Sequence, residues 1–164
     1  METEIKYDTD PFFKEVVSSA PRQDIQLKTA ACRYFYTWYN ISDPNLPRYD
    51  QFDILEHFKY APNIMLLKVI NEGEYEYRLQ GEVIFDLVQK RSKGEIFSSR
   101  SELPHLSRLA DYLNSVASKR IAIHSYGNMA SHDRSHTEFE AFVFPLVDGS
   151  NKISHIIGVM SPLE

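Results

Sequence analysis

The chain has 164 residues and a mass of 19.1 kDa, and 43% of its residues are hydrophobic. This length predicts a single domain, and the balanced composition excludes wholesale disorder and collagen-like repetition. The 18 basic and 23 acidic residues leave a formal net charge of -5. Such a chain has no general positive field, so we expect neither nucleic acid nor a membrane surface as its partner.

The single cysteine, Cys32, indicates a reducing compartment. One thiol cannot form an internal disulfide or a multi-thiolate zinc site. The first ten residues are acidic and polar, unlike the basic and then hydrophobic order of a secretory signal. No stretch reaches the roughly 18 apolar residues of a membrane span. We therefore expect a cytoplasmic protein.

Two segments precede the main body of the chain. Residues 1–22 are polar and interrupted by prolines, which predicts an N-terminal arm that docks loosely. Residues 23–43 lack Gly and Pro, and their apolar side chains recur at spacings of four and three, which predicts an N-terminal helix. These side chains are Leu27, Ala31, Tyr34, Trp38 and Ile41. Asp24 is the expected N-cap, and the helix must end before the proline that follows.

Residues 44–164 have the element order of an α+β domain. A short irregular or helical stretch, Tyr49 to Tyr60, precedes a hairpin formed by Ile64–Ile70 and Tyr75–Gln80. Two short helices and then an antiparallel meander of three strands follow. These elements are Glu82–Gln89, Leu106–Ala117, Ile121–Met129, Thr137–Val147 and Ile153–Met160. The order predicts a five-stranded antiparallel sheet with helices on one face, a layout that often leaves a cavity between them.

A motif at the end of the predicted hairpin carries a family resemblance. It reads Tyr75-Glu76-Tyr77-Arg78-Leu79-Gln80-Gly81, and further segments continue the pattern in order: Pro47–Asp53, Ala61–Leu67, Lys93-Gly94, Phe144–Leu146 and Ile157–Val159. From Cys32 to Met160 the chain resembles the PAS superfamily, and more closely a bacterial PAS-like family that carries the Tyr-Arg-Leu-x-Gly motif. It departs from that pattern at Glu82, where a small hydroxyl residue is common, and at Gln89–Lys93, where a Gly-x-Asp-x-Thr turn is usual.

The resemblance implies a PAS-like domain over residues 44–164 with a sensory or regulatory role. Domains of this kind bind a small ligand or a partner protein and rarely catalyse a reaction, so we expect no enzyme. No kinase, cyclase or helix-turn-helix segment fits in the remaining residues. The signal is therefore expected to pass through association with another chain, an unidentified signalling protein.

Five residues form the predicted ligand-binding set: Tyr77, Arg78, His124, Glu140 and Phe142. Arg78 lies in the middle of a strand, and its charge needs a partner if that face looks toward the helices. Glu140 is one candidate for a structural ion pair, and the carboxylate of a ligand is another. An exposed face is a third interpretation.

The sequence contains no haem or flavin motif, so the identity of any cofactor stays open. The cluster from His132 to His136 has metal-ligating residue types, but no third ligand is nearby and Arg134 would repel a cation, which favours a solvated loop. His105 lies on the helix that carries the iron ligand in haem-binding PAS domains. Cys32 precedes the first strand, unlike the reactive cysteine of flavin-binding PAS domains, and we expect a small buried or interface residue.

The predicted N-terminal helix has two possible roles. The seven-residue spacing of Leu27, Tyr34 and Ile41 is compatible with pairing against a second copy, which makes Leu27, Tyr34 and Trp38 the predicted interface of a homodimer. Alternatively, the helix folds over its own sheet.

Three functional hypotheses follow. The leading one is a sensory module with a small ligand in the pocket between sheet and helices. The second is a ligand-free interaction or dimerisation module, whose core is filled by its own Phe and Tyr side chains. A metal-assisted enzyme using His132 and His136 ranks last, because nothing closes the coordination shell.

Overall fold

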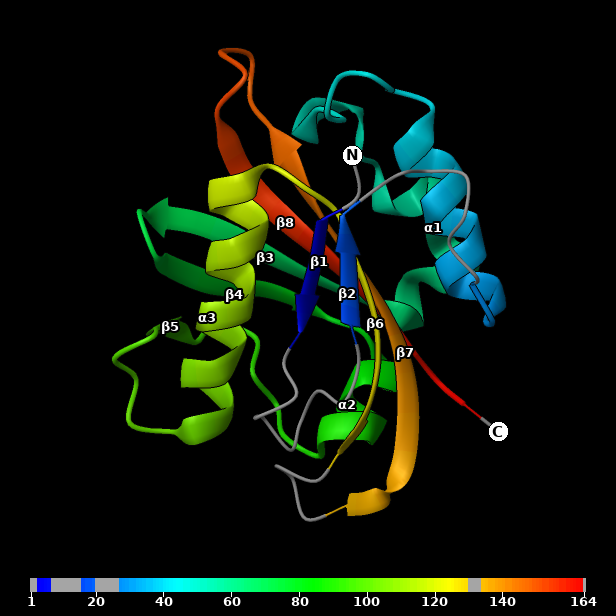
Figure 1. Cartoon of the computed structure of the whole chain (residues 1–164), viewed down its shortest axis with the longest axis vertical. Coiled ribbons are helices and arrows are strands. Elements are labelled where there is room, and N and C mark those ends of the chain that lie inside the picture. Colours follow the sequence, from blue (N-terminus) through cyan, green and yellow to red (C-terminus); the bar gives the residue numbers. More distant parts are fainter. Residues whose placement is uncertain (1–2, 7–15, 20–26, 130–133, 164) are drawn as a thin grey trace.

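The computed structural model describes residues 3–6, 16–19, 27–129 and 134–163, with side chains for 27–127 and 137–163 (Figure 1). Its centre is one antiparallel sheet in the order β1-β2-β6-β7-β8-β3-β4-β5. The strands are β1 (Thr3–Lys6), β2 (Val16–Ser19), β3 (Ile64–Asn71), β4 (Glu74–Gln80), β5 (Ile96–Ser98), β6 (Ile123–Met129), β7 (Arg134–Val147) and β8 (Ile153–Pro162).

The five predicted strands are present as β3, β4, β6, β7 and β8, and they lie side by side in the sheet. Three further strands extend it. The short β5 pairs with β4, and the segment predicted as a loosely docked arm contributes β1 and β2. Ser18 of β2 pairs with His124 of β6, so β2 joins this part of the arm to the sheet and β1 is the edge strand.

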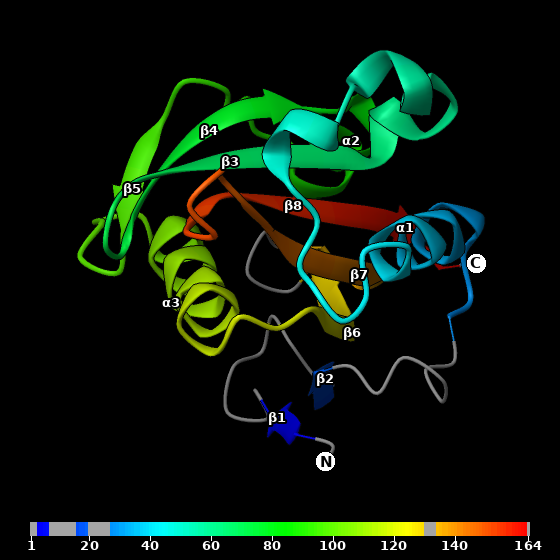
Figure 2. The ribbon, with the colours of Figure 1, turned by 90° about the horizontal axis from the view of Figure 1, so that it is seen from above.

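The helices cover both faces of the sheet. They are α1 (Ala30–Asn40), α2 (Glu82–Val88) and α3 (Pro104–Lys119), with two 3₁₀ segments, η1 (Tyr49–Gln51) and η2 (Ile54–Asn63). The sheet curves around α3, while α1 lies outside the curve (Figure 2). The prediction of helices on one face holds for α2 and α3, and α1 folds over the opposite face of its own sheet.

Strand alternation divides the apolar side chains into two cores. On β3, Met65 and Leu67 pack with α2 and α3, whereas Ile64 and Leu66 pack on the α1 side. The same alternation on β7 sends Ala141 and its odd-numbered neighbours to the first core and Phe142 and Phe144 to the second. Successive side chains of a strand point to opposite faces, so a sheet covered on both sides carries uninterrupted apolar runs.

Helix α1 begins later than the sequence predicts. Thr29 is its N-cap, and the Thr29 hydroxyl accepts a hydrogen bond from the Cys32 N–H at 3.4 Å. The predicted cap, Asp24, lies outside the described residues. The Glu140 carboxylate fixes the start of the helix by accepting the N–H groups of Lys28 and Thr29, both at 2.8 Å.

A steric constraint explains the glycine of the Tyr-Arg-Leu-x-Gly motif, Gly81. At Gly81 the chain turns from β4 into α2, and its N–H donates to the Ile64 carbonyl at 2.8 Å. A methyl group at this position would lie 2.2 Å from the carbonyl oxygen of Pro62 at the end of η2. The close approach of these two backbones therefore requires glycine.

Candidate functional site

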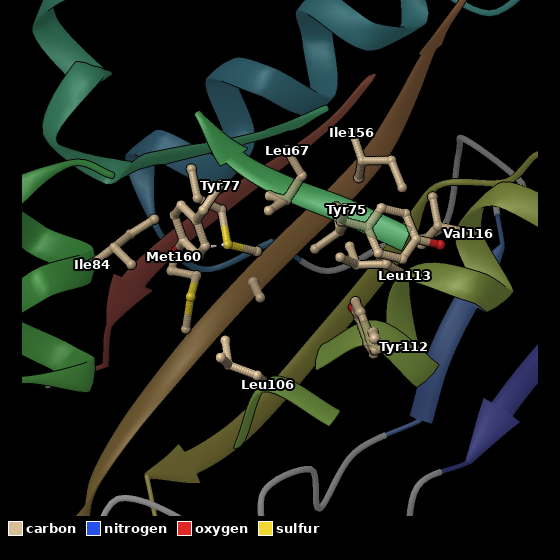
Figure 3. Close-up of a cluster of buried hydrophobic side chains, with 14 of the residues drawn as sticks. Leu67, Tyr75, Tyr77, Ile84, Leu106, Tyr112, Leu113, Val116, Ile156 and Met160 are labelled. Atoms are coloured by element: carbon tan, nitrogen blue, oxygen red, sulfur yellow. Dashed lines mark hydrogen bonds between the residues drawn. The ribbon is translucent and has the colours of Figure 1, made fainter. Parts of the chain in front are cut away.

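A cavity of about 60 Å³ lies between the sheet and the helices α2 and α3. Its walls are predominantly apolar, and Tyr77, Ile84, Leu106 and Met160 converge on it from β4, α2, α3 and β8 (Figure 3). Phe139 and Ala141 of β7 line its floor. This volume exceeds the roughly 10–15 Å³ that one water needs, and it is well below that of a drug-sized site.

Few polar groups reach the cavity. The Tyr77 hydroxyl donates to the Met65 thioether at 3.3 Å, and burial raises the pKa of Tyr77 well above its ordinary value. The Tyr112 hydroxyl and the Ser125 hydroxyl are 3.4 Å apart. His105, at the start of α3, has a pKa lowered by burial and by the charge of Lys90. The lining can therefore hold an apolar molecule and offer it a few hydrogen bonds.

The sheet separates the predicted ligand-binding residues. Only Tyr77 of that set lines the cavity. His124, Glu140 and Phe142 lie on the opposite face, where Phe142 packs against α1. Arg78 also lies away from the cavity, because its side chain is exposed and lies beside Glu76.

The predicted ion pair between Arg78 and Glu140 does not form. Arg78 is an exposed residue whose side chain lies 3.6 Å from the Glu76 carboxylate, also partly exposed. Glu140 pairs instead with His124, at 2.8 Å between carboxylate oxygen and Nε2. The third interpretation of Arg78, an exposed face of the sheet, is what the structure shows.

Glu140 is the most heavily bonded buried carboxylate of the described residues. Besides the His124 ring and the two backbone N–H groups, it accepts the Thr29 hydroxyl at 2.6 Å. Burial would raise the pKa of Glu140, but the hydrogen bonds from His124, Thr29 and Lys28 outweigh it and lower this pKa to about 2. This cluster ties the start of α1 to β6 and β7.

A family model for the PAS domain matches residues 28–161, which extend from the start of α1 through β8. The chain belongs to the PAS domain family. No curated protein matches it. Among solved structures it is similar to that of an RNA-binding Light-Oxygen-Voltage receptor, with 15% identity and a TM-score of 0.47 over 66% of this chain. The match covers 32% of the receptor chain, about a third of its length.

Apart from Tyr77 and His105, the cavity of this PAS domain is built from residues that the sequence did not single out. Met65, Ile84, Leu106, Ala141 and Met160 are ordinary apolar core positions by composition. The alternation of side chains along β7 could have predicted that Ala141 lies on the opposite face of the sheet from Glu140 and Phe142. Parity does not carry along β4, however, because its pairing with β3 has register shifts and Tyr77 and Leu79 lie in different cores.

The remaining candidates in the PAS domain are placed as follows. Cys32 is fully buried in α1, and burial strongly raises the pKa of its thiol. His105 lines the cavity. The cluster around His132 and His136 lies outside the residues whose side chains are described. Within the described part of the chain, no group of three or more potential metal ligands occurs, and no helix is long and apolar enough to cross a membrane.

The predicted interface residues of the PAS domain are partly covered by its own fold. Leu27 and Trp38 are half-buried against the second core, and the Trp38 ring meets Phe144. Tyr34 is 36% exposed, and its hydroxyl is 2.7 Å from His57 Nδ1 in η2. Tyr34 and Phe58 share a shallow surface depression beside η2.

Proposed function

We propose that this PAS domain is a sensory module whose signal is a small molecule bound between the sheet and α2 and α3. The observation that carries the proposal is the apolar cavity at that place. Burial of apolar surface supplies the main free energy of binding, and the few polar groups supply orientation. The module itself performs no catalysis in this proposal.

The position of the cavity supports a regulatory consequence of binding. Its walls come from α2, from α3 and from four residues of β7 and β8, so an occupant contacts both helices and the sheet at once. Packed cores respond to added volume by shifting whole elements. The shift would then alter the surface offered to a signalling partner or to a second copy of the chain.

Native mass spectrometry of freshly purified protein, followed by denaturing mass spectrometry and an absorbance spectrum, tests the proposal. An extra mass that is released on denaturation supports it. Ala141→Leu would fill the cavity from β7 and should abolish the extra mass. Val69→Leu is the matched control, because Val69 packs against the same core and does not line the cavity. Clean apo protein with no added mass would overturn the proposal.

A second candidate function is association without a ligand, favoured by one exposed surface. Leu55 and Phe58 of η2 are 76% and 77% exposed. Exposed apolar side chains grouped on one surface are typical of protein contacts. If η2 mediates homodimer formation, Phe58→Ser should lower the mass measured by sedimentation equilibrium. Ile96→Ser, which changes an exposed residue at the β5 edge, should leave it unchanged, and a monomeric wild-type protein would refute dimerisation.

A further inference from the structure

The Tyr77 hydroxyl has an unusually weak partner. Tyr77 is only 4% exposed, and the hydroxyl donates to the Met65 sulfur, at 3.3 Å. A thioether is a weak acceptor, and the hydroxyl of a buried tyrosine normally finds a stronger one. Both side chains line the cavity, so the donor stands where an occupant would meet it.

Met65 has the freedom to leave this position. It lies over Gly158, the residue opposite it on β8, and a methyl group at Gly158 would come within 2.3 Å of the terminal carbon of Met65. The missing side chain at position 158 therefore makes the room that Met65 fills. A methionine has three rotatable side-chain bonds and adapts to its surroundings, so Met65 can give up this space to another molecule.

The cavity is also close to electrically neutral. Apart from His105, its lining residues carry no carboxylate, ammonium or guanidinium group. The pKa of His105 is lowered, because burial and the charge of Lys90 outweigh the opposite effect of Glu95. A charged ligand would lose its hydration here without gaining an ionic partner, which is a large cost.

We propose that the ligand is a small, neutral, mainly apolar molecule with an oxygen acceptor such as a carbonyl, which replaces the Met65 thioether as the partner of the Tyr77 hydroxyl. This inference rests on the proposed function, since it assigns the chemistry of the same cavity. Binding exchanges a weak O–H···S contact for an O–H···O hydrogen bond. The displaced Met65 side chain opens the additional volume that a ring-sized molecule needs.

Three probes of similar shape test the chemistry. Cyclohexanone carries the acceptor, methylenecyclohexane replaces its oxygen with a carbon, and cyclohexanecarboxylate adds a charge. Dissociation constants come from two-dimensional NMR titration of the full chain. We expect cyclohexanone to bind the wild-type protein more tightly than Tyr77→Phe by roughly 2- to 10-fold, the effect of one net hydrogen bond. Methylenecyclohexane should bind the two proteins equally, and cyclohexanecarboxylate should bind neither.

Met65→Leu is the second variant and keeps the test independent of Tyr77→Phe. It preserves the apolar volume and removes the thioether, so cyclohexanone should bind it at least as tightly as the wild type. In the wild-type protein, the methyl resonance of Met65 should move on addition of cyclohexanone.

The outcomes separate the two proposals. If neither ring nor xenon, which enters dry apolar cavities, binds any of the proteins, the proposed ligand-binding function fails together with this inference. If both neutral rings bind but Tyr77→Phe does not weaken cyclohexanone, the cavity binds ligands and the role of Tyr77 is refuted. Tight binding of cyclohexanecarboxylate would refute the assignment of a neutral ligand.

Discussion

Removal of the charge at Glu140 should uncouple α1 from the sheet. Glu140 is fully buried, and four donors converge on its two oxygens: the N–H groups of Lys28 and Thr29, the Thr29 hydroxyl and the His124 ring. In Glu140→Gln an amide NH2 group replaces one carboxylate oxygen. This hydrogen-bond donor would then face the N–H and O–H donors that the oxygen accepted. Loss of one partner from a buried pair costs about 3–5 kcal/mol.

The pKa of Glu140 leads to a similar magnitude. The pKa is about 2 in the folded protein, against an ordinary value of 4.5. At about 1.36 kcal/mol for each pKa unit, this difference corresponds to about 3 kcal/mol of folding stability. Because the pKa is lower in the folded protein, this stability is present above the ordinary pKa and is lost as the pH falls from about 4.5 toward 2. The wild-type protein should therefore lose stability across this range, and Glu140→Gln should show a flatter dependence.

Urea unfolding followed by far-ultraviolet circular dichroism measures the effect. We expect Glu140→Gln to lower the free energy of unfolding by about 3–5 kcal/mol at pH 7. Glu138→Gln is the matched control, because Glu138 precedes it by two residues on β7 and is exposed, so its change should stay within about 0.5 kcal/mol. A loss below about 1 kcal/mol in Glu140→Gln, with wild-type secondary structure, would show that the cluster does not hold α1.

Three further predictions concern residues outside this cluster. Arg78→Ala should change the free energy of unfolding by less than about 1 kcal/mol in a urea titration, because its ion pair is exposed, and a larger loss would contradict this placement. Gly81→Ala should destabilise the fold by at least about 1–3 kcal/mol, because the added methyl group meets the Pro62 backbone. Gly149 has open space around it, so Gly149→Ala should leave the melting temperature nearly unchanged. Equal effects of the two substitutions would contradict the steric explanation. The pKa of His155 is lowered to about 4 by burial and by two nearby cationic side chains, so the stability that it contributes is present above about 6.5 and is lost as the pH falls toward 4. His155→Phe should flatten thermal stability over that interval, and an unchanged slope would exclude His155 as its source.

The sequence predicts most of the fold because each main strand carries its own pattern. The hairpin of β3 and β4 and the meander of β6, β7 and β8 appear with only small changes at their ends. The three-residue β5 was missed because so short a segment has no measurable alternation. The start of α1 was also wrong, because it is set by Glu140, a residue more than a hundred positions away.

The site was harder to predict than the fold. Residues of the cavity, such as Met65 and Leu106, are apolar and indistinguishable in sequence from residues that fill a core. The predicted binding site included the polar residues His124 and Glu140. In the structure these two side chains are hydrogen-bonded to each other. Tyr77 was predicted as a residue of an aromatic-lined pocket, while its partner Met65 lies on a different strand and can be recognised only once β3 and β4 are paired.

The alternating side chains of β7 connect the cavity on one face of the sheet to the start of α1 on the other face. Ala141 forms part of the cavity floor, and its neighbour Glu140 anchors α1 on the other side of the sheet. A single peptide bond joins them, so a sideways displacement of β7 by an occupant is also a displacement of the anchor. Substitutions at positions 140 and 141 should consequently be energetically coupled rather than additive. Positions 140 and 141 therefore link the cavity on one face of the sheet to the start of α1 on the other.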